Sequence, residues 1–157
     1  MVDVVPLAHK KNTARGIVIH DGRILLMERW RGTLHYFSIP GGGIEPGETP
    51  QQTVVREIAE ETTVTVKVNR QVLEMRDGGF SHKIYLCEYI DGHPHMPDDA
   101  PEAAHGPENR FQPGWVSLDE LPELPLTYWE PLREPLVNGL RLGFDGPVKI
   151  VSAKDSG

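Results

Sequence analysis

The sequence predicts an α+β domain in which a mixed β-sheet is sandwiched between α-helices. Three observations lead to this class: apolar runs of strand length recur on both sides of one acidic helix, that helix lies near the middle of the chain, and a stripe of leucines at helical spacing lies near the end. The 157 residues are enough for one hydrophobic core, and nothing in the composition indicates a second. We therefore expect a single domain over residues 1–157.

The first two strands are predicted on either side of Asp21-Gly22. Residues 16–20 and 23–28 are largely apolar, and Asp-Gly between two such runs is a strong signal for a two-residue hairpin. Residues 24–27 are all apolar rather than alternating. This pattern predicts a strand that is covered on both faces.

A glycine-rich stretch follows the second strand. Residues 29–33 are expected to form a loop, and residues 34–40 lead into Gly41-Gly42-Gly43. Because glycine has no side chain, we interpret these three residues as a loop whose backbone passes close to a metal ion or a phosphate group. The alternative is a plain turn, since glycine-rich turns are common.

An acidic helix is predicted to begin at Pro50. Thr49 can serve as its N-cap, Pro50 suits the first helical position because its missing N–H would be unpaired there, and Gln52 completes a Thr-x-x-Gln capping box. At about 100° per residue, the apolar and acidic side chains fall on opposite faces. The apolar face holds Val54, Val55, Ile58 and Ala59, and the acidic face holds Glu57, Glu60 and Glu61.

The acidic face is electrostatically unfavourable by itself. Like charges at i,i+3 and i,i+4 repel one another, and the last turn of a helix already carries a partial negative charge. Arg56 can neutralise only part of this charge, and three carboxylates beside a glycine loop suit a hard divalent cation such as Mg²⁺ or Mn²⁺. The alternative is a solvated acidic face, as most charge runs are.

The glycine stretch and the helix together resemble the Nudix box, Gly-x5-Glu-x7-Arg-Glu-U-x-Glu-Glu-x-Gly-U, where U is an apolar residue. The matching positions are Gly42, Glu48, Arg56, Glu57, Ile58, Glu60, Glu61 and Val64. The resemblance spans about residues 13–140 and implies the Nudix fold, in agreement with the predicted class. Thr63 departs from the pattern, because it stands where the closing glycine is expected. A β-branched residue adopts positive φ poorly, so we expect the helix to end differently, or Thr63 to enter the next strand directly.

The resemblance implies hydrolysis of a pyrophosphate bond in a nucleoside diphosphate linked to another group. Such a reaction needs divalent cations that offset the charge on the phosphates, and a base that deprotonates water for in-line attack. The cofactor expected is Mg²⁺ or Mn²⁺. The expected metal ligands are Glu57, Glu60 and Glu61, with a backbone carbonyl from Gly41 or Gly42 as a further ligand.

Further roles are expected for residues of the same box. Glu57 is also a candidate for the general base, although the base varies between subfamilies. Glu48 and Arg56 are expected to form an ion pair that joins the loop to the helix and holds the carboxylates in register.

Downstream of the helix, strands are predicted at residues 64–68, continuing or bending through 71–75, and at 80–89. Residues 93–110 are polar and contain four prolines, which predicts a long loop that is either functional or mobile. A Trp-containing strand then leads into an acidic turn and the last helix. We expect the strand at Trp115, and a helix whose buried stripe is Leu132, Leu136 and Leu140. Pro131 fits the first turn of this helix, Pro135 marks a bend or a later start, and Asn138-Gly139 is a possible end. A small strand is expected at residues 147–151.

Candidates for substrate binding are less specific than the box. Arg29 and Arg31 could clamp a phosphate, although exposed loop arginines are usually just solvated. Phe80, His82 and Tyr85 could stack on a base, although aromatic residues on a strand more often belong to the core. Glu108 could be an additional metal ligand or base, although a solvated loop acid is the alternative. His93, His95 and His105 are interpreted as surface residues rather than a zinc site.

Net charge limits the kinds of binding partner that we expect, and cysteine content bears on the location of the protein. The formal net charge of −7 argues against a nucleic acid polymer or an anionic membrane surface as the main partner. A small phosphorylated ligand remains possible, because a bound metal can reverse the local sign. Cys87 is the only cysteine, and no export signal or membrane-spanning run is indicated, so a cytoplasmic location is expected.

The substrate is left open between nucleoside triphosphates, including oxidised ones, and nucleotide sugars. The marks of the ADP-ribose, dinucleoside polyphosphate and coenzyme A subfamilies are missing or misplaced downstream of the box. A different class of function is a catalytically silent Nudix-like domain that binds or senses a nucleotide, and a third is a purely structural acidic helix. A homodimer is common in the family, but nothing in the sequence decides the oligomeric state.

Overall fold

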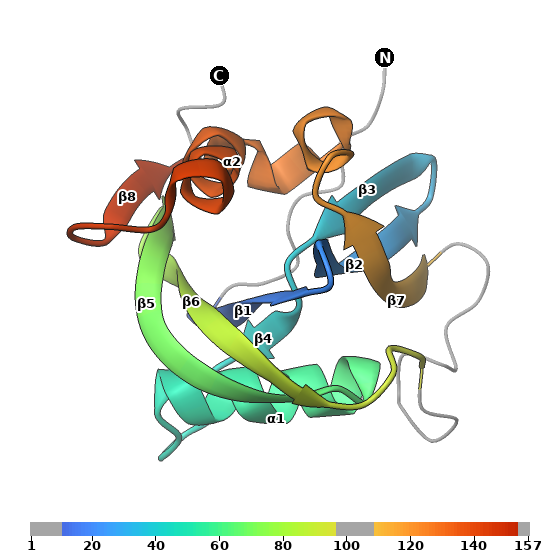
Figure 1. Ribbon diagram of the computed structural model, residues 1–157. Coiled ribbons are helices and arrows are strands. Elements are labelled where there is room, and N and C mark those ends of the chain that lie inside the picture. The colour runs from blue at the N-terminus through green and yellow to red at the C-terminus, as the bar shows by residue number, and fades with distance from the viewer. Residues whose placement is uncertain (1–10, 97–108, 154–157) are drawn as a thin grey trace.

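The computed structural model of the chain describes residues 11–96 and 109–153 (Figure 1). The strands are β1 Thr13–His20, β2 Arg23–Arg31, β3 Leu34–Ser38, β4 Gly41–Gly43, β5 Thr65–Asp77, β6 Phe80–Asp91, β7 Asn109–Ser117 and β8 Lys149–Ser152. The α-helices are α1 Pro50–Thr62 and α2 Arg133–Leu142, and the 3-10 helices are η2 Leu121–Glu123 and η3 Thr127–Leu132.

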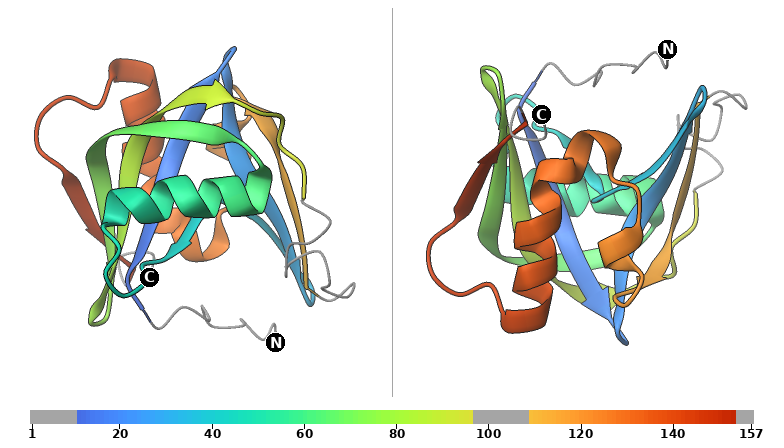
Figure 2. Two further views of the ribbon diagram at one scale, coloured as in Figure 1. Left: turned by 90° about the horizontal axis from the view of Figure 1, so that it is seen from below. Right: turned by 90° about the horizontal axis from the view of Figure 1, so that it is seen from above.

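The strands of the described residues form one eight-stranded mixed sheet. Its main order is β3-β2-β1-β6-β5-β8, while β4 pairs with β1 and β7 pairs with β2. The pairs β1–β6 and β5–β8 are parallel, and the others are antiparallel. Helix α1 lies on one side of the sheet, and α2 with η3 lies on the other (Figures 1 and 2). The predicted mixed sheet between helices is thereby confirmed.

The Asp21-Gly22 hairpin is present, and its strands separate soon after the turn. Strands β1 and β2 pair only at Ile19↔Ile24 and His20↔Arg23. Beyond that point β1 pairs with β4 and β6, whereas β2 pairs with β3 and β7. The sheet therefore opens between β1 and β2, and this opening holds the candidate site described below.

Two segments predicted as loops are strands. Residues 29–31 continue β2, because their backbone pairs with β3 on one side and β7 on the other. Residues 41–43 form β4, which pairs antiparallel with residues 13–15 of β1. Both corrections have the same physical reason, since the pairing partners are distant in sequence and no local pattern identifies them.

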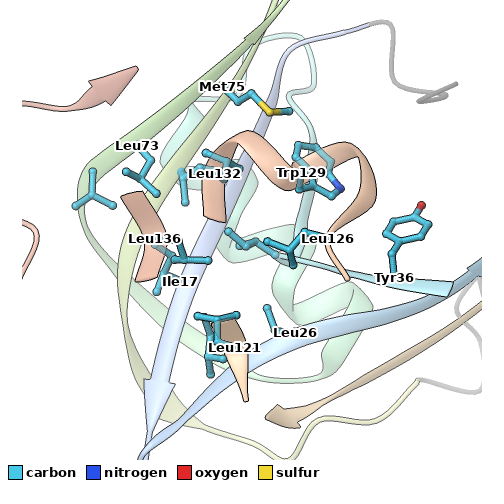
Figure 3. Close-up of a cluster of buried hydrophobic side chains, with 14 residues drawn as sticks. Ile17, Leu26, Tyr36, Leu73, Met75, Leu121, Leu126, Trp129, Leu132 and Leu136 are labelled. Atoms are coloured by element: carbon cyan, nitrogen blue, oxygen red, sulfur yellow. The ribbon is translucent and has the colours of Figure 1, made fainter. Parts of the chain in front are cut away.

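The two faces of the sheet carry separate hydrophobic cores. One core lies under η2, η3 and α2 and contains Ile24, Leu26, Trp129, Leu132 and Leu136 (Figure 3). The other lies under α1 and contains Leu25 with residues of that helix. Strand β2 supplies both cores with successive side chains, so the prediction that residues 24–27 are covered on both faces is confirmed.

Helix α1 begins as predicted and ends differently. The capping box is complete: Thr49 Oγ1 accepts a hydrogen bond from the Gln52 N–H, and Gln52 Oε1 accepts one from the Thr49 N–H. At the other end Thr63 takes the left-handed conformation, with φ 65° and ψ 8°. The expectation that Thr63 avoids this conformation is wrong. Its hydroxyl donates to the His93 carbonyl at 2.7 Å, which offsets a backbone cost of about 1–2 kcal/mol.

The C-terminal region agrees with the sequence in part. Helix α2 starts late, so that Pro131 lies in η3 and Pro135 lies in the first turn of α2. The helix ends at Leu142 rather than at Asn138-Gly139. Gly139 lies inside the helix and lets the Phe144 ring pack against it, since a Cβ at this position would lie 2.0 Å from Phe144 Cε1. The predicted terminal strand is present as β8. No helix within residues 11–96 and 109–153 is long and apolar enough to cross a membrane.

Gly16 of β1 allows α1 to approach the sheet closely. A Cβ at this position would lie 2.7 Å from Ile58 Cδ1, 2.9 Å from Cys87 Sγ and 3.0 Å from Val54 Cγ1. We predict that Gly16→Ala lowers the free energy of unfolding by about 1–3 kcal/mol through overpacking, as measured by urea denaturation. Gly114→Ala in β7 is the matched control, because a Cβ there meets no atom within 4 Å. Equal stability of the two variants would contradict this prediction.

Candidate active site

A cavity of about 330 Å³ lies where β1 and β2 separate. Its walls come from both halves of the sheet and from α1. The lining residues are Lys11, Arg15, Met27, Arg29, Arg31, Ser38, Gly41, Gly42, Gly43, Glu57, Glu61, Asn109 and Phe111. A larger cavity of about 730 Å³ lies between α2 and β8, but none of the predicted site residues lines it. We therefore take the smaller cavity as the candidate active site.

The glycines of β4 allow the helix carboxylates to lie against the backbone. A Cβ on Gly42 would lie 2.5 Å from the carboxyl carbon of Glu57, so a larger residue would displace this carboxylate. The Gly41 N–H donates to Glu61 Oε2 at 3.3 Å. The predicted closeness of the glycines to the box carboxylates is thus present, although the glycines belong to a strand.

Arg56 connects the carboxylates of the box to β4. Its Nε donates to Glu48 Oε2 at 2.7 Å and its Nη2 to Glu48 Oε1 at 2.9 Å, so the expected ion pair is bidentate. Nη1 lies 3.1 Å from Glu57 Oε1 and 3.2 Å from Glu60 Oε2, and Nη2 also donates to the Gly43 carbonyl at 3.2 Å. One guanidinium therefore holds three carboxylates and the strand together.

The hydrogen bonds to Glu48 change its protonation behaviour. Those from Arg56 and, next, from the Thr53 hydroxyl hold the pKa of Glu48 at about 2, well below its ordinary value of 4.5. Conversely, the hydrogen bond to Glu48 raises the pKa of Arg56. The pair is therefore fully charged near neutral pH.

The three box carboxylates do not form one preassembled cluster. Glu57 and Glu61 line the cavity, whereas the Glu60 side chain is 60% exposed and pairs with Arg56. Within the described residues, no three His, Cys, Asp or Glu side chains converge on a point that could hold a metal ion. The oxygen donors still suit a hard cation, because the carboxylates of Glu57 and Glu61 lie close to the backbone of Gly42 and Gly41. Arg56 Nη1 contacts both Glu57 and Glu60, so the space between these two carboxylates already holds a positively charged group.

Basic side chains outnumber acidic ones in the cavity. Among the described residues, its lining contains Lys11, Arg15, Arg29 and Arg31 and the carboxylates of Glu57 and Glu61, although the whole chain carries a net charge of −7. Arg29 lies with its Cζ 3.8 Å from the Phe111 ring centroid. The two predicted arginines therefore do reach the site, from a strand rather than from a loop.

Several lining residues were missed from the sequence. Arg15 and Phe111 enter the site through the pairing of β1 with β4 and of β2 with β7, which join segments far apart in the chain, and Lys11 lies just before β1 with its side chain beside Gly43. One signal was available: Met27, Arg29 and Arg31 alternate along β2, so Met27 shares a face with the two predicted arginines.

Other predicted residues lie elsewhere. Phe80 is partly exposed at the start of β6, and Tyr85 is only 4% exposed in the core under α1. Neither lines the cavity, so the position of these two residues does not support a role in stacking on a base. His93 and His95 lie near the end of α1, where His95 Nδ1 is 3.1 Å from Thr63 Oγ1. Glu108 and His105 lie outside the described residues.

Comparison with known proteins gives one consistent family. A model of the NUDIX domain matches residues 10–138. Among curated proteins, a NAD-capped RNA hydrolase NudC from Pectobacterium carotovorum is 33% identical over 105 residues, which are 65% of this chain and 36% of that protein. An ADP-ribose pyrophosphatase from Methanocaldococcus jannaschii is 36% identical over 103 residues, or 60% of each chain. This chain thus spans little more than a third of the length of the first relative and three fifths of the second.

The fold is also found among solved structures. A NUDIX hydrolase from Nitrosomonas europaea aligns with a TM-score of 0.67 over 92% of this chain and 81% of that one, at 15% identity. At this identity the likeness concerns the fold alone.

The Glu48–Arg56 pair predicts a defined acid dependence of stability. Because the pKa of Glu48 is lower in the folded state, the pair stabilises the fold fully above about pH 4.5 and loses this effect as the pH falls towards about 2. We predict that Glu48→Gln is less stable than the wild type near neutral pH, and that the difference shrinks as the pH falls through this window. Urea denaturation at several pH values measures it. Glu120→Gln, at an exposed residue after β7, is the control, and a difference independent of pH would contradict the prediction.

Proposed function

The chain belongs to the Nudix family, and from this premise we propose that it hydrolyses a pyrophosphate bond in a small nucleotide, in which a nucleoside diphosphate is linked to another group. One observation carries the proposal: Glu57 and Glu61 of the box face four basic side chains across a single cavity. Carboxylates on one wall suit a metal and a water molecule, and cations on the other suit phosphate oxygens.

We propose Mg²⁺ or Mn²⁺ as the cofactor. Glu57 and Glu61 would hold it beside Gly41 and Gly42, whereas Glu60 is exposed, pairs with Arg56 and does not line the cavity. When bound, such an ion offsets charge on the phosphates and lowers the pKa of water. The oxygen-only donor set of these residues supports this choice of metal.

The other residues of the site are proposed to bind the phosphate groups of the substrate or to orient the catalytic carboxylate. Arg29 and Arg31 of β2 line the cavity, where they would contact phosphate oxygens. Glu57 is the candidate for the general base, with its carboxylate held by Arg56 at 3.1 Å and packed against Gly42. Glu48 acts through Arg56, because its bidentate ion pair fixes the guanidinium that contacts Glu57.

The names of the relatives widen the range of substrates to be tested. The relatives in the comparison are named for NAD-capped RNA and for ADP-ribose, and both ligands contain a diphosphate linked to a nucleoside. Nucleoside triphosphates and other nucleotide sugars remain in the proposed class. The exclusion of nucleic acid polymers, the cytoplasmic location and the homodimer stay predictions from the sequence.

A nucleotide-binding domain without turnover is the second candidate. The observation that favours it is the contact of Arg56 with both Glu57 and Glu60, which neutralises part of the charge that a metal would otherwise offset. Binding of a nucleotide that raises the melting temperature, without hydrolysis in Mg²⁺ or Mn²⁺, would establish this second function.

Removing one carboxylate charge tests the catalytic proposal. We predict that Glu57→Gln and Glu61→Gln each reduce turnover by about 100-fold or more, because each removes an oxygen charge from the metal-binding set. The measurement is product release from a panel of nucleoside triphosphates, nucleotide sugars, ADP-ribose, NAD and NAD-capped RNA, with Mg²⁺ or Mn²⁺. Glu120→Gln is the control for charge. Near-normal turnover in both site variants would contradict the assignment.

Gly42→Ala tests the same site without changing its charge. The added Cβ would lie 2.5 Å from the Glu57 carboxyl carbon, so the carboxylate must move, whereas the backbone of β4 can stay in place. We predict a loss of turnover of about tenfold or more with a change in the free energy of unfolding below about 1 kcal/mol. Gly114→Ala is the steric control. Full activity of Gly42→Ala would show that the position of Glu57 is not critical.

A further inference from the structure

We propose that Arg15 of β1 binds the phosphate chain of the substrate, and that Thr13 and His82 hold its guanidinium towards the cavity. This inference rests on the proposed function, since it requires an anionic ligand in the cavity that Glu57 and Glu61 line. Arg15 is not part of the box, and it enters the site only through the pairing of β1 with β4.

Arg15 is a buried cation without a carboxylate partner of its own. It is only 5% exposed, yet it lines the cavity. Its Nε donates to Thr13 Oγ1 at 3.2 Å and its Nη1 to the Ile39 carbonyl at 3.0 Å, and both acceptors are neutral. Arg15 forms no ion pair with the described residues, and its Nη2 donates to none of them. A buried charge held this way is stabilised when an anion approaches its remaining N–H groups.

Arg15 keeps its charge in the cavity although it is buried. Burial lowers the pKa of Arg15 to about 10, so the side chain stays protonated at neutral pH. The carboxylates of Glu61 and Glu57 attract it, while the Arg29 guanidinium repels it. A phosphate oxygen between Arg15 and Arg29 would remove this repulsion, which gives the two arginines a common ligand.

A hydrogen-bond chain fixes the orientation of Arg15. Because the Nε of arginine can only donate, Thr13 Oγ1 accepts from it, and the Thr13 hydroxyl hydrogen can then point to His82 Nδ1 at 2.7 Å. Nε2 of the fully buried His82 lies 3.9 Å from Asp77 Oδ2 and has no hydrogen-bond partner among the described residues. Burial and, next, the charge of Arg15 lower the pKa of His82 to about 4, so its ring is neutral and Nδ1 can accept. His82 is thus a positioning residue rather than one that stacks on a base.

Packing restrains the same side chain. The Cζ of Arg15 lies 4.3 Å from the ring centroid of Trp129, which comes from η3 on the side of the sheet opposite α1. On another side, a Cβ on Gly41 would lie 2.6 Å from Arg15 Cγ. Arg15 is therefore held by contacts and hydrogen bonds before any ligand arrives, and a preorganised guanidinium loses little conformational entropy on binding phosphate.

The test measures binding of inorganic pyrophosphate and of a non-hydrolysable nucleoside triphosphate analogue by calorimetry, with EDTA present so that no metal contributes. We expect Arg15→Met to weaken both affinities by about tenfold or more, because the guanidinium is lost. Thr13→Val should weaken them by about threefold to tenfold, because the guanidinium of Arg15 is kept but loses the hydrogen bond that orients it. Arg15→Lys should recover part of the loss. Arg110→Met is the matched control, since Arg110 also lies over an aromatic ring, that of Trp30, but does not line the cavity.

Kinetics and stability separate the possible outcomes. With metal and substrate, KM should rise more than kcat falls in Arg15→Met, whereas a merely structural role would leave KM unchanged among the folded molecules. Unchanged affinity for pyrophosphate in a folded Arg15→Met would overturn the inference while leaving the proposed hydrolysis intact. If Arg15→Met does not fold, unchanged affinities in both Arg15→Lys and Thr13→Val would overturn it. A wild-type protein that binds pyrophosphate through Arg15 but hydrolyses nothing would refute the proposed function and support this inference.

Discussion

The site depends on the bidentate ion pair between Glu48 and Arg56. Without a cation among them, Glu57, Glu60 and Glu61 would repel one another within a single helical turn. Arg56 contacts two of these carboxylates, and its pair with Glu48 and its hydrogen bond to the Gly43 carbonyl tie the helix to β4. One side chain therefore makes the acidic face compatible with folding and sets the distance between helix and strand.

The shape of the sheet supplies the second requirement, which is space. Strands β1 and β2 share only the pairs next to the Asp21-Gly22 turn, and they then take different partners. The groups that face the resulting opening come from backbones fixed on both sides: Arg15 by β4 and β6, Arg29 by β3 and β7. A tight turn followed by divergence thus creates a cavity without a long loop.

Local signals predicted local structure well. The Asp21-Gly22 hairpin and the capping box of Thr49 and Gln52 depend on a few neighbouring residues, and both are present. Thr63 shows the limit of such reasoning, because the hydrogen bond that accompanies its left-handed conformation comes from His93, 30 residues away. In the same way, the box indicated Glu57 and Glu61, but Arg15 joined them only through the pairing of β1 with β4, which the sequence of β1 alone does not encode.

The distribution of charge connects the site with the choice of ligand. A chain with a net charge of −7 repels other anions at close range, and salt screens this repulsion beyond about 8 Å at physiological ionic strength. Among the described residues that line the cavity, however, four are basic and two are carboxylates, so these side chains together favour an anion. A short polyphosphate can place its whole charge inside this region. Three of the cations come from strands, Arg15 from β1 and Arg29 and Arg31 from β2, whereas Glu57 and Glu61 come from α1, so basic and acidic groups of the cavity are supplied by different elements of the fold.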